Sequence, residues 1–375
     1  MKLLVGIVAL LAVLLSGCSS DKMSVNPAKL QNFNSTVSFD VRWRQNVGKM
    51  GNNVLLPALT ENFVFAANSK GEIQGFDRKS GKQLWRVDTD APISGGVGAA
   101  DGLVLVGGLK GDVFAYQERS GELLWKSKVS SEVLSAPSVA EGVVVVRTGD
   151  GRITGLDSKS GKQLWLYERA TPSLVARSNA GVSIHRGIIY VGFPAGKLAA
   201  IGLHNGVSVW ESSVSQPRGN TELERVSDIT SLPFVDDGQV CAIAFQGRLS
   251  CFDADQGGAL WNRDISSDKG LTMLRKYLFL TDTDGTVMAL DKLSGSSYWK
   301  NSQLSLRKTT APLAFGKYLV VADYEGYLHV LSRDDGSFLA RFATDGSAIR
   351  SAPVPTDDGF LVQTKDGDLY SLAIH

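Results

Sequence analysis

Two of the three cysteines in this chain are spaced so that they could form a disulfide. Cys241 and Cys251 flank a turn at Gln246-Gly247 and lie in two short apolar runs that each read as a strand. A hairpin with a three-residue loop would place them directly opposite each other, whereas a two-residue loop would move them to a diagonal. A cross-strand disulfide and two unreactive core thiols both fit this pattern. An oxidising compartment would favour the disulfide.

The third cysteine, Cys18, follows an apolar run near the start of the chain. Lys2 supplies a positive charge, and residues 3–15 are apolar but too few to span a membrane as a helix. The run ends Leu15-Ser-Gly-Cys18, which resembles the bacterial lipobox. In that motif signal peptidase cuts before the cysteine, and the cysteine is then acylated. A plain secretory signal that happens to contain a cysteine is the alternative.

Acylation of Cys18 would decide where the protein resides. The next residue is Ser19 rather than an aspartate, and in enteric-type bacteria this resemblance implies sorting to the outer membrane. Several acyl chains, palmitate among them, contribute about 0.8 kcal/mol per buried CH₂ and so anchor a protein stably. We therefore expect a signal peptide over residues 1–17 and a lipidated cysteine with a flexible tether over residues 18–38. The protein would face the periplasm from the outer membrane.

Other residue types with catalytic or metal-binding chemistry are scattered along the chain. No histidine lies within metal-ligand spacing of another histidine, a cysteine or a paired carboxylate. The stretch from Thr281 to Gly285 resembles the start of a calcium loop but lacks the later ligands. No nucleophile elbow is present, and a net charge of +1 without a basic run argues against nucleic acid. We expect no enzyme activity and no catalytic, cofactor-binding or metal-binding residues.

A fifteen-residue pattern from Gly71 to Trp85 recurs along the chain and predicts the elements that carry these residues. It begins with a turn glycine, continues through a short alternating strand and Asp-x-x-Ser-Gly, and closes with Leu-Trp. Its leading glycines are Gly71, Gly111, Gly151, Gly196, Gly247, Gly285, Gly326 and Gly367. A period near 40 residues with about four strands per repeat is typical of a β-propeller.

The ends of the chain predict how the ring closes. The last repeat lacks its turn and tryptophan strand, and the missing piece matches Phe39 to Arg44 at the other end. We therefore predict an all-β, eight-bladed β-propeller of four-stranded blades over residues 39–375, with the last blade closed by the N-terminal strand. All seven tryptophans then take one repeat position, with Ala340 as the eighth, and we expect them to be core residues.

Two intervals between repeats are longer than the others, at 45 and 51 residues, and insertions of this kind map to loops on a binding face. The first holds Leu174, Val175 and Arg177 after a proline-stiffened turn, the composition of a small binding hot spot. The second holds Glu224 and Arg225, which suit a polar rim. The alternative is that the apolar side chains pack back on the blade and the charges form a solvated face.

Two families share features with this repeat. Asp-x-x-Ser-Gly-Lys-x-x-Trp resembles the tryptophan-docking motif of quinoprotein alcohol dehydrogenases, which bind pyrroloquinoline quinone and calcium on the axis of an eight-bladed propeller. Those enzymes are longer and carry a vicinal Cys-Cys pair, which this chain lacks. A quinone-dependent dehydrogenase or a ligand-binding propeller is therefore the alternative function.

The lipobox, the tether and eight repeats together resemble the BamB family, the PQQ-like-repeat propeller lipoproteins of the outer-membrane β-barrel assembly machinery. The resemblance covers essentially the whole mature chain. It implies a scaffold without enzyme activity, which binds the POTRA domains of the barrel protein BamA, works beside the other lipoproteins of the complex and helps unfolded outer-membrane proteins insert into the membrane.

The resemblance also implies where the partner binds. The family's contact surface uses residues that match Leu174, Ala176, Arg177, Asp228 and Thr230. Ala176 and Thr230 depart from the pattern, because a larger apolar residue and a carboxylate are expected at these positions.

Overall fold

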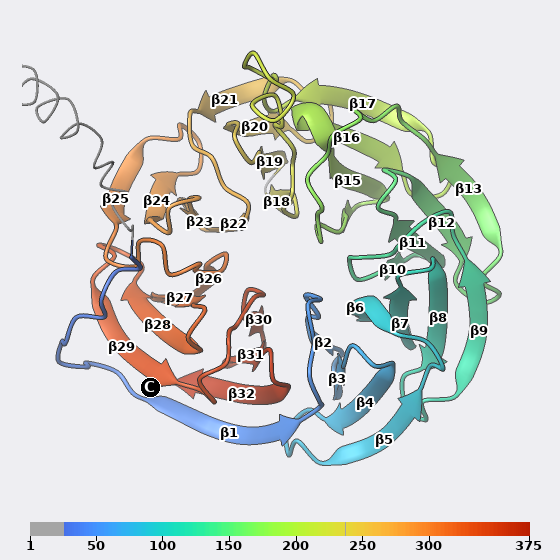
Figure 1. Ribbon diagram of the computed structural model, residues 1–375, viewed down its shortest axis with the longest axis horizontal. Helices are drawn as coiled ribbons and strands as arrows, with labels where there is room; N and C mark the ends of the chain where they lie inside the picture. Colours follow the sequence, from blue (N-terminus) through green and yellow to red (C-terminus); the bar gives the residue numbers. More distant parts are fainter. Residues whose placement is uncertain (1–25, 237) are drawn as a thin grey trace, which may run out of the picture.

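The alternating apolar segments of each repeat form strands, and four strands form one antiparallel sheet. In the computed structural model, which describes residues 26–236 and 238–375, eight such sheets stand in a ring as the blades of a β-propeller (Figure 1). The predicted all-β, eight-bladed fold is confirmed. The predicted signal peptide and Cys18 lie outside the described residues.

Within each blade the strands follow one another from the axis of the ring outwards (Figure 1). The innermost strands are β2 (Ala58–Leu59), β6 (Ile93–Ala100), β10 (Ser138–Ala140), β14 (Ser183–His185), β18 (Phe234–Asp236), β22 (Leu271–Leu274), β26 (Leu313–Phe315) and β30 (Val354–Pro355). The second strands are β3 (Phe63–Ala67), β7 (Leu103–Gly108), β11 (Val143–Arg147), β15 (Ile188–Phe193), β19 (Gln239–Ile243), β23 (Tyr277–Thr281), β27 (Tyr318–Ala322) and β31 (Phe360–Gln363). The third strands are β4 (Glu72–Asp77), β8 (Asp112–Gln117), β12 (Ile153–Asp157), β16 (Lys197–Gly202), β20 (Leu249–Asp253), β24 (Val287–Asp291), β28 (Tyr327–Ser332) and β32 (Asp368–Ile374). The outer strands are β5 (Gln83–Asp88), β9 (Leu123–Lys128), β13 (Gln163–Tyr167), β17 (Ser208–Ser213), β21 (Ala259–Arg263), β25 (Ser297–Asn301), β29 (Phe338–Ala343) and β1 (Phe39–Asn46).

Blades 1 to 7 each take four consecutive strands, from β2–β5 to β26–β29, and blade 8 combines β30, β31 and β32 with β1. β1 lies antiparallel to β32, from Phe39 opposite Ile374 to Asn46 opposite Asp368 (Figure 1). The prediction that the N-terminal strand completes the last blade is therefore confirmed. Ring closure depends on two strands from opposite ends of the sequence.

The hydrophobic core lies between neighbouring blades. One cluster joins Leu105 and Val113 of blade 2 to Val144 and Leu156 of blade 3, with Trp125 at its outer edge. All five side chains are buried. Burial on both faces of each sheet explains why the second strands read as nearly continuous apolar runs, since neither face meets water.

Seven tryptophans attach seven of the eight outer strands to the following blade. The indole N–H of Trp125 donates to the carbonyl of Ser158, 2.8 Å away in blade 3. A Cβ on Gly161 would lie 2.6 Å from the same ring, so this glycine, at φ +68°, both makes the turn and leaves room for the indole. The other six indoles donate in the same way to the carbonyls of Arg78, Glu118, Leu203, Ala254, Lys292 and Arg333.

Ala340 stands at the eighth tryptophan position, on β29 opposite Val330. An indole there would dock on the turn between the third and outer strands of blade 8. Those strands are β32 and β1, and no turn joins them, because they come from opposite ends of the sequence. Instead Phe39 of β1 packs on Phe342 of β29, with ring centroids 5.1 Å apart. The departure from the repeat thus has a topological cause.

The ring has two faces, because neighbouring strands are antiparallel. We call one the loop face: it carries the connections from each outer strand to the next inner strand and the hairpins between second and third strands. We call the other the turn face: it carries the Asp-x-x-Ser-Gly turns between third and outer strands. The two long insertions, residues 168–182 and 214–233, connect outer to inner strands and therefore lie on the loop face.

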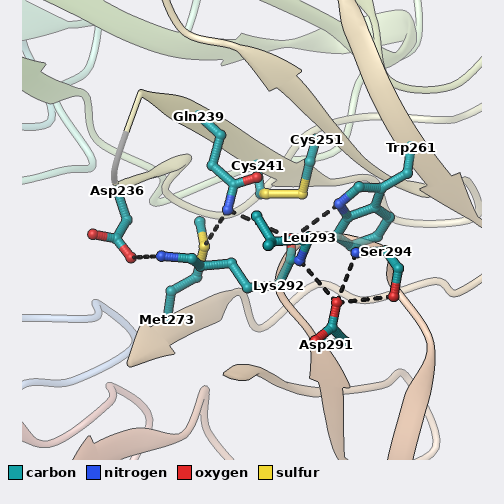
Figure 2. Close-up of a disulfide and its surroundings, with 10 residues drawn as sticks. All are labelled: Asp236, Gln239, Cys241, Cys251, Trp261, Met273, Asp291, Lys292, Leu293 and Ser294. Carbon is teal, nitrogen blue, oxygen red and sulfur yellow. Dashed lines mark hydrogen bonds and ion pairs between the residues drawn. A yellow bond between two sulfur atoms is a disulfide. The ribbon is translucent and has the colours of Figure 1, made fainter. Parts of the chain in front are cut away.

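Cys241 and Cys251 lie directly opposite each other on β19 and β20, and a disulfide joins them (Figure 2). The N–H of Ala244 donates to the carbonyl of Arg248, which leaves the three-residue loop that favours this arrangement over the diagonal one. The disulfide is fully buried. Cys251 also pairs with Trp261 on β21, so the disulfide braces the strand beside one of the docked indoles.

Residues 26–38, which the sequence assigned to the tether, run along the outside of blade 7 before β1 begins (Figure 1). The ring of Phe33 stacks on that of Phe338, with centroids 5.4 Å apart. The N–H of Thr36 donates to the carbonyl of Leu339, 2.8 Å away. The bounds of the tether stay a prediction. In the part of the chain that is described, no helix has the length and apolar character to cross a membrane.

Candidate partner-binding site

The two long insertions lie on either side of blade 4 and touch each other on the loop face. The hydroxyl of Ser178 in the first donates to the carbonyl of Thr230 in the second, 3.1 Å away. Nearer the tips, the hydroxyl of Ser173 lies 3.5 Å from a carboxylate oxygen of Glu222. The structure therefore brings together the two loops that the sequence singled out.

Asp228 joins these loops from inside. Its side chain is only 3% exposed, and its two carboxylate oxygens accept the backbone N–H groups of Ala176, at 2.7 Å, and Ala195, at 2.9 Å. Ala195 belongs to the 3₁₀ turn η2 (Pro194–Gly196), which leads into β16. Charge-assisted bonds of this kind are stronger than neutral ones. Asp228, which the resemblance places at the contact surface, lies beneath it and positions the first loop.

A second charged residue, Arg147 at the end of β11, lies under the same loop. Its Nη1 donates to the carbonyl of Ala180, 2.9 Å away. Burial lowers the pKa of Arg147 to about 10, and the carboxylate of Asp228 opposes that shift. Arg147 is therefore charged at neutral pH. Sequence reasoning missed it, because an arginine that ends a run of valines gives no sign of the loop above it.

The first loop presents its tip to solvent. Leu174 is 42% exposed, whereas Val175 and Ala176 are half-buried. Arg177 is exposed, and its Nη2 lies 2.9 Å from a carboxylate oxygen of Glu132 in the neighbouring connection. Exposed ion pairs contribute about 0–1 kcal/mol, so Arg177 can exchange Glu132 for a partner's carboxylate at little cost. A cavity of about 230 Å³ opens beside these residues.

The second loop folds back on itself through its own charged side chains. One carboxylate oxygen of Glu224 accepts the N–H groups of Asn220 and Thr221, at 2.8 and 3.2 Å. These bonds hold the pKa of the Glu224 carboxyl below its usual range. The Nε of Arg225 donates to the carbonyl of Gly219, 3.1 Å away. Both residues were predicted to meet a partner, and both already shape the loop.

The most exposed apolar side chain of the second loop is one that sequence reasoning did not select. Leu223 is 68% exposed, and it directly follows Glu222, whose carboxylate lies 3.5 Å from the hydroxyl of Ser173 in the first loop. The sequence did contain an indication of this role, because Leu223 is a leucine among charged residues inside a long insertion. Thr230 is half-buried, and its hydroxyl has no hydrogen-bond partner among the described residues.

The chemistry of this surface suits a protein partner. It combines two exposed leucines with an exchangeable arginine on loops that are tied down from beneath. Across residues 26–236 and 238–375, no three His, Cys, Asp or Glu side chains are grouped closely enough to hold a metal ion. Apolar anchors with an arginine at their edge are the usual composition of a binding hot spot.

Comparison with known proteins identifies the family of the chain. A family model described as outer membrane protein assembly factor BamB matches residues 40–91 and 69–301. The assembly factor BamB of Pseudomonas aeruginosa is 44% identical over 372 residues, which is 98% of each chain. The crystal structure of BamB from Moraxella catarrhalis superposes with a TM-score of 0.83 at 26% identity, over 90% of this chain and all of that one.

Quinoprotein enzymes share the architecture at much lower identity. The quinohemoprotein alcohol dehydrogenase of Comamonas testosteroni superposes with a TM-score of 0.74 at 12% identity, over 89% of this chain and 76% of that one. Such a likeness shows the fold alone. The relatives that match over the full length are named as assembly factors, in agreement with the expectation that this chain is not an enzyme. The chain belongs to the BamB family of outer membrane protein assembly factors.

Proposed function

We propose that the protein is a non-enzymatic scaffold for outer-membrane protein assembly, which binds the POTRA domains of BamA through its loop face. The observation that carries this proposal is the pair of insertions held together by Asp228, on which Leu174, Leu223 and Arg177 are exposed. A rigid ring holds these loops in place, so little conformational entropy is lost when a partner docks.

The anchor is part of the same proposal. Acylation of Cys18 would hold the propeller at the periplasmic side of the outer membrane, beside BamA and the other lipoproteins of the complex. Tethering raises the local concentration of the loops near their partner, so a contact of modest area suffices. The scaffold would help to keep the assembly complex together, and unfolded outer-membrane proteins would reach BamA within that complex.

The test is capture of purified POTRA domains by the full-length protein. Leu174→Ala combined with Arg177→Glu removes the apolar tip and reverses the charge that would meet a partner carboxylate. We expect capture to fall by at least about tenfold, because loss of one hot-spot residue costs about 2 kcal/mol or more. Circular dichroism and the melting temperature should stay near those of the wild type.

The matched control is Leu293→Ala, an exposed leucine of the turn face that should leave capture unchanged. Equal capture by the double variant and the wild type would show that the loops are not the contact surface. Loss of capture by the Leu293 variant as well would mean that binding is not confined to the loop face.

A further inference from the structure

Residues 28–36, which we call the strap, run along the outside of blade 7 before β1 begins (Figure 1). Two arginines of the ring hold the backbone of the strap. The Nη1 of Arg341, on β29, donates to the carbonyl of Gln31, 3.1 Å away. The Nη1 of Arg307 donates to the carbonyl of Ala28 at the same distance. Because both donors are charged, these bonds are stronger than neutral ones.

The side chains of the strap add aromatic contacts to these hydrogen bonds. The ring of Phe33 stacks on that of Phe338, with centroids 5.4 Å apart. The guanidinium of Arg341 lies 5.0 Å from the centre of the Phe33 ring, within the range of a cation–π contact. The N–H of Thr36 donates to the carbonyl of Leu339 on β29. Arg341 therefore contributes to both the backbone contacts and the aromatic contacts of the strap.

A histidine and an aspartate inside blade 7 connect the two arginines. Asp323 and His329 are both completely buried. The Oδ2 of Asp323 lies 2.7 Å from the Nε of Arg307 and 3.0 Å from the Nε2 of His329. On the other side of the imidazole, the Nε of Arg341 lies 3.2 Å from Nδ1. The two residues that hold the strap are thus joined through one imidazole and one carboxylate.

These hydrogen bonds fix the protonation state of His329. An arginine N–H can only donate and a carboxylate accepts, so Nδ1 must offer a lone pair to Arg341 and Nε2 must carry the proton that bonds Asp323. Only the neutral imidazole with its proton on Nε2 satisfies both neighbours. Burial lowers the pKa of this imidazole, the carboxylate of Asp323 opposes the shift, and both arginines add to it. The docked strap therefore requires an uncharged histidine.

Arg341 is the more sensitive of the two arginines to a charge on this histidine. Glu325, in the hairpin between β27 and β28, pairs with Arg307, as Asp323 does. In the part of the chain that the structure describes, no carboxylate pairs with Arg341. Tyr327 is also a titratable neighbour, with its ring centroid 6.2 Å from that of the imidazole. A proton on Nδ1 would therefore remove a hydrogen bond from Arg341 and place two positive charges side by side.

We propose that this cluster is a pH-sensitive switch, in which protonation of His329 releases the strap from the outside of blade 7. The proton displaces Arg341 from Nδ1, and Arg341 then loses the position from which it holds Gln31 and Phe33. Release of the strap uncovers the ring of Phe338. The switch is independent of the proposed partner, because it acts on the opposite side of the ring from the two long insertions.

Amide hydrogen exchange in the full-length protein tests the switch. The N–H of Thr36, 2.8 Å from the carbonyl oxygen of Leu339, reports whether the strap is docked. After correction for the intrinsic exchange rate, we expect its protection factor to fall about tenfold or more from about pH 7.5 to about pH 5, because a hydrogen bond to a charged group is lost. The N–H of Val129, which donates to the carbonyl of Gly111 in blade 2, should change much less. Unchanged protection at Thr36, or an equal loss at Val129, would overturn the proposal.

Two variants separate protonation of His329 from other effects of acid. His329→Gln stays neutral and should give Thr36 the same protection at both pH values; a loss as large as that of the wild type would refute the switch. Arg341→Met should lower the protection of Thr36 at about pH 7.5, while circular dichroism is unchanged. Arg333→Met is the matched control, because Arg333 donates to the carbonyl of Gly316 on the turn face, and it should leave the strap docked. Full protection of Thr36 in the Arg341 variant would also overturn the proposal, without any measurement in acid.

Discussion

Replacing Asp228 by asparagine should loosen the first loop without unfolding the ring. The carboxylate accepts the N–H groups of Ala176 and Ala195, whereas an amide of the same shape offers one oxygen and turns its NH₂ toward the other donor. One charge-assisted bond is lost, and a buried N–H is left unpaired, at about 1.5–3 kcal/mol. That corresponds to about a 10- to 100-fold rise in the open population of the loop.

Hydrogen exchange at Ala176 measures this opening directly, and capture of POTRA domains measures its consequence. We expect faster exchange over residues 174–180, weaker capture, and unchanged exchange in the distant blades. Glu224→Gln is the matched control, because Glu224 also accepts two backbone N–H groups but is exposed, so water replaces the lost bond. Unchanged exchange at Ala176 in the Asp228 variant would refute the clamp, whatever happens to capture.

Three further predictions concern stability, each measured by denaturant or thermal unfolding. Trp125→Ala should cost about 3–5 kcal/mol without a selective loss of partner capture, since its indole docks on blade 3 away from the loop face; a cost below 1 kcal/mol would contradict interblade docking. Cys241→Ala with Cys251→Ala should cost about 2–3 kcal/mol, because the bond closes only a short hairpin; no difference from the wild type would show that the bond contributes nothing. Burial lowers the pKa of His329, so the imidazole stays neutral in the folded protein at a pH where the unfolded chain takes up a proton. The free energy of unfolding should therefore fall as the pH drops below about 6.5. A His329→Gln variant whose free energy of unfolding changes with pH in the same way as that of the wild type would contradict this assignment.

The repeat made most of the fold predictable from the sequence. Every blade packs against its neighbours in the same way, and therefore the same residues recur: a turn glycine, the Asp-x-x-Ser-Gly turn and the docked tryptophan. The number of strands, the closure of the ring and the position of Ala340 could all be predicted from this repeat. The reason for Ala340 could not be read, since it depends on where the two chain ends meet. The route of residues 28–36 was equally hidden, because Leu30 and Phe33 are isolated apolar residues in a polar stretch.

The candidate site was predictable in place but not in detail. Insertion length located both loops, because extra residues in a repeat protein leave the blade at its face. It could not show that Asp228 points inward, that Arg147 from another blade lies beneath, or that Leu223 is the more exposed leucine. These depend on contacts between segments that are far apart in sequence, which no local pattern records.

The shared blade 8 has a consequence for the order in which the molecule can form. Each of blades 1 to 7 consists of consecutive strands and can assemble as soon as its own residues are available, whereas β1 must wait for β32. Pairing strands from the two ends of a chain is entropically costly and slow. During synthesis the first strand would therefore emerge early and remain unpaired until the last strand followed. We expect closure of the ring to be the final folding step. Loss of β32 alone should leave blades 1 to 7 without the β1–β32 pairing that closes the ring.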